Sequence, residues 1–229
     1  MQTLKVSEIF SSIQGEGPSA GKPCTFLRLA LCNLHCHWCD TKYTWDFEHY
    51  SFREEVHHRN AEEIARALTP AAGDRVVITG GEPLLQQAGL EALFSAMGGR
   101  WYVEVETNGT LVPSRSLVER VNQWNVSPKL SSAGDPSSKR IRLDALQALR
   151  DTGQAWLKLV IDDENDLTQA DELITRLGWP KDRVFFMPQA ATRVELQRRS
   201  KKLELACRKR GLRLSPRLHI ERWDGARGR

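Results

Sequence analysis

Hydrophobic positions along the chain follow two patterns: short apolar runs, and longer stretches in which apolar residues return every three or four positions. The short runs are typical of buried strands, and the longer stretches are typical of amphipathic helices. Six strands are predicted, over residues 25–31, 75–79, 101–107, 123–127, 155–161 and 183–187. Helices are predicted between and after them, over residues 60–68, 84–97, 139–151, 164–177 and 192–210.

This alternation predicts an α/β fold with a parallel sheet. A closed eight-stranded barrel typically needs about 250 residues, whereas this chain has 229 residues and six predicted strands. A partial, open TIM-like barrel therefore fits the pattern better than a closed one. No internal repeat or linker interrupts the pattern, so we predict a single domain over residues 1–229. It opens with a substrate-binding hairpin in residues 4–18 and closes with a basic segment.

Three cysteines follow the first predicted strand directly, in the stretch LCNLHCHWCD. Cys32, Cys36 and Cys39 have the spacing C-x3-C-x2-C. A structural zinc site and a [4Fe–4S] cluster held wholly by protein each need four ligands, but Cys24 and Cys207 lie outside this stretch. Three cysteines would leave one iron of a cluster open to a small molecule. Radical S-adenosylmethionine (SAM) enzymes use that arrangement.

Two other interpretations of the cysteines stay open at this point. One is a set of reduced thiols without a metal, and the other is a zinc knuckle that takes His35 or His37 as its fourth ligand. The rest of the chain is needed to choose between them.

Unusual residues gather at the ends of the predicted strands, which is where a barrel of this kind places its chemistry. Gly80-Gly81-Glu82-Pro83 ends the second strand, and its glycines are expected to leave backbone groups bare for the amino group of SAM. In Gln14-Gly15-Glu16-Gly17, the side chains of Gln14 and Glu16 stand beside glycines and can form hydrogen bonds with a polar heterocycle. Arg28 lies inside an apolar strand, which is costly unless it meets a carboxylate or a polar cavity.

Composition and charge narrow the class of protein further. The chain is 40% hydrophobic and 27% charged, and it contains no apolar run long enough for a membrane span or a signal peptide. Its five cysteines do not form a disulfide pattern, so we expect a reducing, cytoplasmic location. Residues 192–229 hold 13 Lys and Arg against 4 Asp and Glu. We interpret this basic segment as a solvated helix face rather than a nucleic-acid site, and we expect Cys207 to lie in the core.

Several of these motifs together resemble one enzyme family. The blocks SSIQGEGPSAGKPCTFLRLALCNLHCHWCDT, TGGEP, ETNGT, SPK and LKLVID resemble 7-carboxy-7-deazaguanine synthases, over most of residues 8–190. These are radical SAM enzymes of the 7-deazapurine pathway that leads to queuosine. The resemblance implies a carbon–nitrogen lyase that converts 6-carboxy-5,6,7,8-tetrahydropterin to 7-carboxy-7-deazaguanine. A 5′-deoxyadenosyl radical would remove the C6 hydrogen of the pterin, after which the ring contracts and ammonia is lost.

The resemblance also implies cofactors, partners and roles for particular residues. The cofactors would be a [4Fe–4S] cluster, SAM and Mg2+, the electron donor a flavodoxin or ferredoxin, and the assembly a homodimer that serves tRNA modification. Cys32, Cys36 and Cys39 would hold the cluster, and Thr41 would bind Mg2+. Contacts with SAM would come from Gly81, Glu106, Ser127, Pro128, Lys129 and Gln189. Contacts with the substrate would come from Ile13, Gln14, Gly15, Glu16, Arg28, Thr79 and His219.

The chain departs from the family pattern just before the first cluster cysteine. Leu31 stands where the family usually has glycine, so the loop either accepts a Cβ there or takes a shifted path. Two other functions are weighed against the family. One is a glycyl-radical-enzyme activase, which shares C-x3-C-x2-C and GGEP-like segments but usually lacks the SIQGEG block. The other is a non-enzymatic metal protein that binds RNA through its basic segment.

Overall fold

Nine strands form one curved sheet in the part of the chain that the computed structural model describes, residues 2–68 and 74–228. The strand order is β3-β1-β2-β4-β5-β6-β7-β8-β9. All six strands predicted from the sequence are present, and they run parallel to one another. They are β2 (Pro23–Leu29), β4 (Arg75–Gly80), β5 (Tyr102–Thr107), β6 (Gln123–Val126), β7 (Ala155–Ile161) and β8 (Val184–Pro188).

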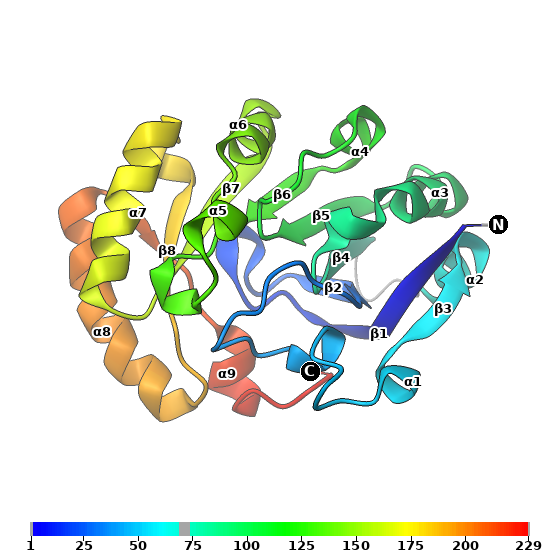
Figure 1. Ribbon diagram of the computed structural model, residues 1–229, viewed down its shortest axis with the longest axis horizontal. Helices are drawn as coiled ribbons and strands as arrows, with labels where there is room; N and C mark the ends of the chain where they lie inside the picture. Colours follow the sequence, from blue (N-terminus) through cyan, green and yellow to red (C-terminus); the bar gives the residue numbers. More distant parts are fainter. Residues whose placement is uncertain (1, 69–73, 229) are drawn as a thin grey trace.

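Three further strands extend the sheet at its two edges. β1 (Thr3–Ile13) runs antiparallel to β2, and β3 (His57–Asn60) pairs with the other side of β1. At the opposite edge, β9 (Arg213–Leu214) runs parallel to β8. Within the described residues β3 and β9 do not pair with each other, and Figure 1 shows a sheet that curves without closing. The prediction of an open barrel is confirmed.

The longer helices form a layer on the convex side of the sheet (Figure 1). They are α2 (Ala61–Ala67), α3 (Gln87–Met97), α4 (Arg115–Arg120), α6 (Leu143–Asp151), α7 (Glu164–Leu177) and α8 (Arg193–Arg210). The short helical segments are α1 (Phe52–Glu55), α5 (Ser137–Arg140), α9 (Leu218–Trp223), η1 (Gly17–Ser19), η2 (Lys42–Thr44), η3 (Pro83–Gln86), η4 (Ser131–Ala133) and η5 (Lys181–Arg183). Among the described residues, no helix is both long and apolar enough to cross a membrane.

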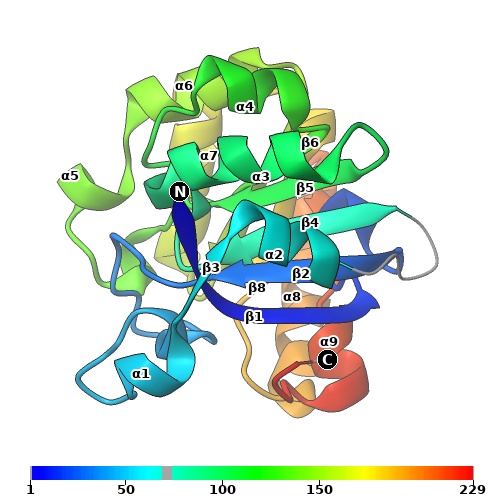
Figure 2. The same ribbon diagram turned by 90° about the vertical axis from the view of Figure 1, so that its right-hand side faces the viewer.

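The parallel strands turn alternate side chains to the two faces of the sheet. On β5, Val103 and Val105 belong to the main apolar core beneath the helices. Glu104 and Glu106 turn to the concave side, where both accept hydrogen bonds from Gln14. The core therefore occupies the convex side, and the concave side is left for polar chemistry. Figure 2 shows the molecule after a 90° turn, with α9 at the lower right beside α8.

The structure differs from the sequence predictions mainly where a segment depends on a distant partner. No strand or helix was predicted in residues 46–59, but they contain α1 and the start of β3, which forms because the free edge of β1 pairs with it. Pro83 begins the 3-10 segment η3 rather than the α-helix itself, and the helix predicted at 139–151 is divided into α5 and α6. Asn60 and Glu63 form a capping box at the start of α2, within the helix predicted over residues 60–68.

Candidate active site

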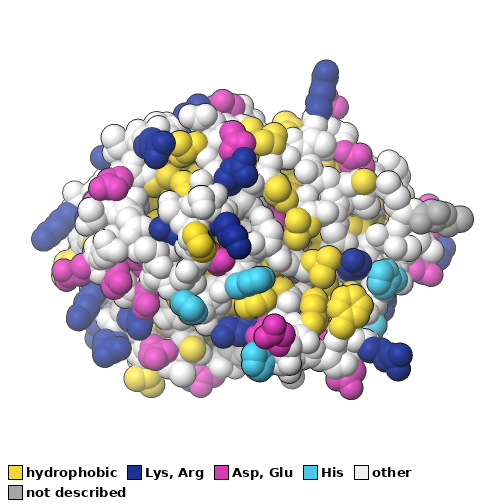
Figure 3. Space-filling model, viewed as in Figure 1, with side chains coloured by type: hydrophobic (Ala, Val, Ile, Leu, Met, Phe, Trp, Pro, Cys, Tyr) yellow, Lys and Arg dark blue, Asp and Glu magenta, His cyan; other side chains and the backbone are white. Residues whose placement is uncertain are grey.

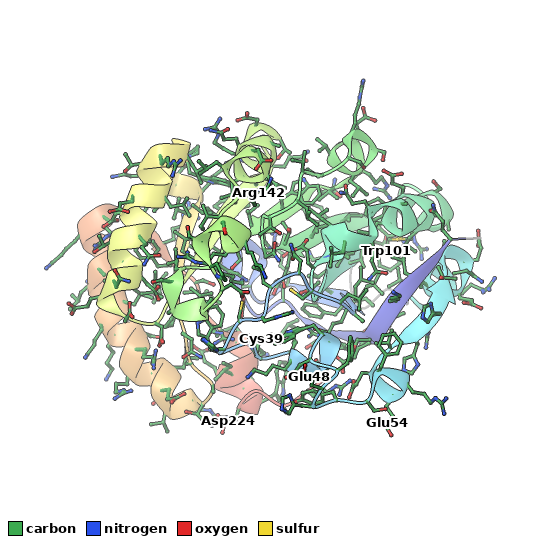
Figure 4. All side chains as sticks on the ribbon, viewed as in Figure 1. Cys39, Glu48, Glu54, Trp101, Arg142 and Asp224 are labelled. Atoms are coloured by element: carbon green, nitrogen blue, oxygen red, sulfur yellow. The ribbon has the colours of Figure 1, made fainter. Side chains whose placement is uncertain are left out.

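A cavity of about 620 Å³ lies on the concave side of the sheet, between the carboxyl ends of the parallel strands and the cluster loop, residues 31–45. Figure 4 shows Cys39 near the middle of the molecule, with Asp224 of the C-terminal segment below it. On the same face, Figure 3 shows histidine, lysine and arginine side chains gathered around the lower middle. Of the site residues predicted from the sequence, only Pro128 does not line this cavity. Those that do are Ile13, Gln14, Gly15, Glu16, Arg28, Cys32, Cys36, Cys39, Thr41, Thr79, Gly81, Glu106, Ser127, Lys129, Gln189 and His219.

The three thiols of the cluster loop are free and face the cavity together. Cys36 is buried, and Cys32 and Cys39 are half-buried. Burial raises the pKa of the Cys32 thiol to about 12 and that of the Cys36 thiol to about 11. At neutral pH these groups are thiols until a metal displaces their protons, so metal binding and deprotonation occur together.

Hydrogen-bond donors surround the sulfur atoms. The indole Nε1 of Trp45 donates to Cys39 Sγ at 3.3 Å, and the backbone N–H of Leu34 donates to Cys32 Sγ at 3.5 Å. The hydroxyl of Thr41 lies 3.6 Å from Cys39 Sγ. Donors of this kind suit thiolates that carry negative charge, as the ligands of an iron–sulfur cluster do.

The two histidines of the loop do not complete a site for a single metal ion. Among the described residues, no group of three or more His, Cys, Asp or Glu side chains is arranged to hold one ion. His35 instead stacks on Trp45, with ring centroids 4.9 Å apart, and the backbone N–H of His37 donates to the carbonyl of Ala133. A four-iron cluster takes each cysteine at a different iron, so its ligands need not converge on one point. The arrangement therefore fits a cluster better than a zinc knuckle.

The GGEP segment fixes the path of the cluster loop. The N–H of Gly81 donates to Leu29 O at 2.9 Å, and the N–H of Glu82 donates to Leu31 O at 2.8 Å. The expectation of bare backbone groups is therefore wrong for the amides of Gly81 and Glu82, which donate to the neighbouring backbone, whereas contact of the carbonyls with the amino group of SAM stays a prediction. A Cβ on Gly81 would lie 1.8 Å from Leu31 O, which explains the glycine. The carboxylate of Glu82 is fully buried and accepts hydrogen bonds from the N–H groups of Leu84 and Asn108.

Leu31 adopts a left-handed backbone conformation, with φ of 73°. This conformation favours glycine, since the Cβ of other residues meets the following carbonyl. The loop thus keeps the turn that glycine would give and accepts a Cβ in it. The backbone N–H of Leu31 donates to Thr44 O at 2.7 Å, and this hydrogen bond joins the two ends of the cluster loop.

β5 turns two glutamates to the concave side of the sheet, of which Glu106 lines the cavity and Glu104 is fully buried. The amide nitrogen of Gln14 donates to Glu104 Oε1 at 2.8 Å and to Glu106 Oε1 at 3.0 Å, and its amide oxygen accepts from the N–H of Glu16. Burial and the nearby charge of Glu106 raise the pKa of the Glu104 carboxyl, and Arg75 pairs with it at 2.9 Å. Glu106 faces the cavity and accepts from the hydroxyl of Thr79 at 2.7 Å.

Cations surround Glu16 on the opposite wall. The Nζ of Lys158 on β7 donates to Glu16 Oε2, and the Nε of Arg217 donates to Glu16 Oε1 at 3.3 Å. Burial alone would raise the pKa of the Glu16 carboxyl, but Lys158 and Arg217 hold it well below its ordinary value. His219 Nε2 lies 3.8 Å from the same carboxylate, and a Cβ on Gly15 would lie 2.5 Å from His219 Nδ1. The QGEG turn and the C-terminal segment are thus in direct contact.

Arg28 is paired inside the cavity. Its Nε donates to Glu8 Oε2 at 2.8 Å, and the hydroxyl of Tyr43 donates to the same oxygen at 2.9 Å. The other oxygen of Glu8 accepts from the Nε of Arg227 at 2.6 Å, and Arg227 also stacks over the Tyr43 ring. The ion pair with Glu8 and the contact with the polar cavity therefore offset the free-energy cost of placing Arg28 in an apolar strand.

Two of the residues expected near SAM, Gly81 and Lys129, lie beside the cluster loop. The Nζ of Lys129 donates to Ser127 Oγ at 3.0 Å and lies 5.8 Å from the centroid of the Trp38 ring. The N–H of Gln189 donates to Ile161 O, which places the residue just beyond β8.

Several residues that line this cavity were not predicted from the sequence, and those that form its charged network are Lys158, Arg217, Tyr43 and Arg227. Lys158 carried a signal, because it is the one charged residue in the apolar run of β7. The sequence around Arg217, Tyr43 and Arg227 carries no such signal, because their roles depend on which distant segment packs against them.

Comparison with known proteins agrees with this geometry. The profile of the Radical SAM superfamily matches residues 29–170. The 7-carboxy-7-deazaguanine synthase of Pyrobaculum aerophilum is 38% identical over 227 residues, which cover 99% of this chain and 97% of that protein. The 7-carboxy-7-deazaguanine synthase of Hyperthermus butylicus is 37% identical over 228 residues, covering 95% of this chain and 92% of that protein.

A solved structure supports the same assignment. The crystal structure of QueE from Escherichia coli superposes with a TM-score of 0.69 at 26% sequence identity, covering 93% of each chain. Family membership makes the chain an enzyme, so the alternative of a non-enzymatic RNA-binding protein is set aside. The chain belongs to the 7-carboxy-7-deazaguanine synthase family of radical SAM lyases, which use a [4Fe–4S] cluster and SAM.

Proposed function

We propose that this chain converts 6-carboxy-5,6,7,8-tetrahydropterin to 7-carboxy-7-deazaguanine with loss of ammonia. The observation that carries the proposal is one cavity lined by the three thiols of the cluster loop and also by the QGEG turn, Arg28 and His219. Its volume of about 620 Å³ falls within the range of small-molecule sites. This favours a pterin over the protein backbone that a glycyl-radical activase would accept. In this proposal the whole chain works as a single domain.

Cys32, Cys36 and Cys39 hold the cluster, which leaves one iron for SAM. When bound, the cluster and SAM would supply the removal of a hydrogen atom from C6 of the substrate, with SAM acting as a catalyst that is not consumed. The chain holds SAM along the side of the cavity nearest the cluster loop. Glu106 and Lys129 offer opposite charges there, which suit the amino group and the carboxylate of SAM. The remaining SAM contacts are Gly81, Ser127, Pro128 and Gln189.

The QGEG turn recognises the pterin ring. Glu16 presents a carboxylate that Lys158 and Arg217 keep ionised, so it can accept hydrogen bonds from the N–H groups of the heterocycle. The side-chain amide of Gln14 is already bonded at both its nitrogen and its oxygen, so Gln14 holds the turn in shape. Ile13, Gly15, Thr79 and His219 complete the wall around the substrate.

Arg28 binds the carboxylate of the substrate. In the described contacts only its Nε is engaged, by Glu8, so its terminal amino groups keep their capacity for a second carboxylate. Glu8 in turn is held by Tyr43 and Arg227 and stays in place when the substrate arrives. The guanidinium is thus positioned before binding, which lowers the entropic cost of recognition.

Mg2+ and two partners belong to the same proposal. Thr41 would give its hydroxyl to Mg2+, an ion that prefers oxygen ligands and shares its shell with substrate and water. A flavodoxin or ferredoxin would deliver the electron to the cluster, the chain would act as a homodimer, and the product would serve tRNA modification.

Anaerobic turnover tests the proposal directly. The reconstituted protein is given SAM, Mg2+, dithionite and 6-carboxytetrahydropterin, and the products are read by mass spectrometry. A product lighter than the substrate by one ammonia, formed many times per SAM, supports the proposal. Cleavage of SAM with the pterin unchanged would refute the substrate and favour an activase. Leaving out Mg2+ in a parallel reaction tests whether turnover needs the ion that Thr41 is proposed to bind.

A further inference from the structure

We infer that Trp45 is a positioning residue for the cluster, and that its indole N–H raises the reduction potential of the cluster through Cys39. The Nε1 of Trp45 donates to Cys39 Sγ at 3.3 Å, within the range of hydrogen bonds to sulfur. Trp38 stands between two cluster cysteines, yet its buried indole nitrogen has no partner among the described residues. A tryptophan close to the cysteines in sequence therefore does not always donate to a sulfur atom. The hydrogen bond of Trp45 results from the position of its ring in the loop.

The structure holds the Trp45 ring in place from two directions. Its face stacks on His35, with the rings 13° from parallel. Its backbone follows η2, where its N–H donates to Lys42 O at 3.0 Å. The preceding residue, Thr44, is fully buried and accepts from the N–H of Leu31 at 2.7 Å. An indole fixed in this way keeps its N–H directed at the sulfur without losing further side-chain freedom.

The expected effect on the potential follows from charge. Reduction of a [4Fe–4S] cluster adds one electron, so negative charge on the cysteine sulfurs increases. A hydrogen bond to such a sulfur stabilises the reduced state more than the oxidised state, and hydrogen bonds to the sulfurs are among the factors that set cluster potentials. Trp45 therefore makes the cluster easier to reduce by its electron donor. The N–H of Leu34 should raise the potential in the same way through Cys32. Because this donor belongs to the backbone, a side-chain substitution does not remove it.

The inference rests on family membership and on the cluster, and does not depend on pterin turnover. Trp45→Phe keeps an aromatic face for His35 and removes the N–H donor. We expect the variant to load iron and sulfide as the native chain does, with a more negative midpoint potential. The measurement is an anaerobic titration with dithionite and redox mediators, followed by visible absorbance and by the electron paramagnetic resonance of the reduced cluster. No substrate is present, so a failure of the proposed function leaves the result unchanged.

A matched control separates the hydrogen bond from the loss of an indole. Trp156 lies on β7, packs on Phe185 and does not line the cavity, so Trp156→Phe should leave the potential unchanged. Trp45→Tyr, which also lacks the indole N–H, is measured beside Trp45→Phe and should shift the potential in the same direction. An unchanged or less negative potential in both Trp45 variants would overturn the inference. Loss of the fold or of the cluster in both would also overturn it, because Trp45 would then have only a structural role.

Discussion

Arg217 and Asp40 are 177 positions apart in the chain, and Nη2 of Arg217 lies 2.9 Å from Oδ2 of Asp40. The same buried guanidinium donates to Glu16 and, at 2.6 Å, to the carbonyl of Ala190. One cation therefore joins the cluster loop, the QGEG turn and the end of β8. Asp40 stands between a proposed cluster ligand and the proposed Mg2+ ligand, so Arg217 ties the metal side of the cavity to the substrate side.

Removal of this cation should affect stability and substrate binding together. We expect Arg217→Ala to lower the free energy of unfolding by about 2 kcal/mol, since the buried carboxylate of Glu16 loses one of its two cationic partners and the carbonyl of Ala190 loses its donor. The KM for the pterin should rise more than that for SAM, because Glu16 loses one of the charges that hold it. Arg217→Lys should restore part of both losses. Denaturant unfolding and steady-state kinetics measure the two effects.

The control for this variant is Arg222→Ala, in the same short helix region but exposed. It should change neither quantity. Equal increases in the two KM values for Arg217→Ala would contradict a specific link between Arg217 and the substrate wall.

The three cysteines of the cluster loop should be individually essential. Cys32→Ala, Cys36→Ala or Cys39→Ala each removes one of three iron ligands, so the brown absorbance and all turnover should be lost. Cys207 lies in the apolar core and does not line the cavity, and Cys207→Ala should leave iron content unchanged. Iron and sulfide per chain after anaerobic reconstitution check both expectations. Retained turnover in any one of the first three variants would contradict its assignment as a ligand.

The parallel strands and the cluster loop were predictable from the sequence because their signals are local. Apolar runs such as that of β7 give a buried strand by themselves, and the cysteine spacing needs no distant partner. The capping box at Asn60 is equally local, since both of its hydrogen bonds span three residues. Placement of these strand ends around one cavity then follows from a parallel sheet.

The rest depends on which segments meet in space. Nothing in the stretch around Arg217 indicates that it reaches Asp40 and Glu16, because the contact exists only after the C-terminal segment folds back across the strands. β3 formed for a similar reason, since its pairing with β1 is what makes it a strand. The contact of Gln14 with the substrate stays a prediction, but the hydrogen bonds of its side chain to two glutamates on β5, some ninety positions away, could not be predicted from the local sequence.

Arg28→Ala should weaken substrate binding more than SAM binding. The guanidinium is the proposed partner of the substrate carboxylate, and SAM lies on the other side of the cavity in this proposal. The fold should survive the change, because Glu8 keeps Tyr43 and Arg227 as partners. Isothermal titration with each ligand measures the two affinities, and a loss of at least tenfold is expected for the pterin. The reverse order of losses would refute the role of Arg28.

Leu31 should accept glycine and reject a β-branched residue. Its left-handed backbone costs a residue with a Cβ roughly 1–2 kcal/mol, while the extra freedom of glycine in the unfolded chain costs about 0.5–1 kcal/mol. Leu31→Gly should therefore leave the melting temperature and iron loading close to native values. Leu31→Val should lower both, since β-branched residues rarely adopt this conformation. Equal behaviour of the two variants would show that the backbone conformation at Leu31 is not what limits the loop.

Gly81→Ala tests whether the GGEP segment positions the cluster loop. A Cβ at this position would lie 1.8 Å from Leu31 O and 3.0 Å from the N of Cys32, so the backbone that carries the first cysteine has to move. We expect the variant to fold, because the core beneath the helices is untouched, but to retain less than half of the native iron after reconstitution. Gly99→Ala is the matched control, since a Cβ there meets no atom within 4 Å. Circular dichroism and iron content are measured on both. Full iron loading in Gly81→Ala would mean that the loop adapts to the displacement, and that the geometry of the GGEP segment does not determine how the cysteines meet the cluster.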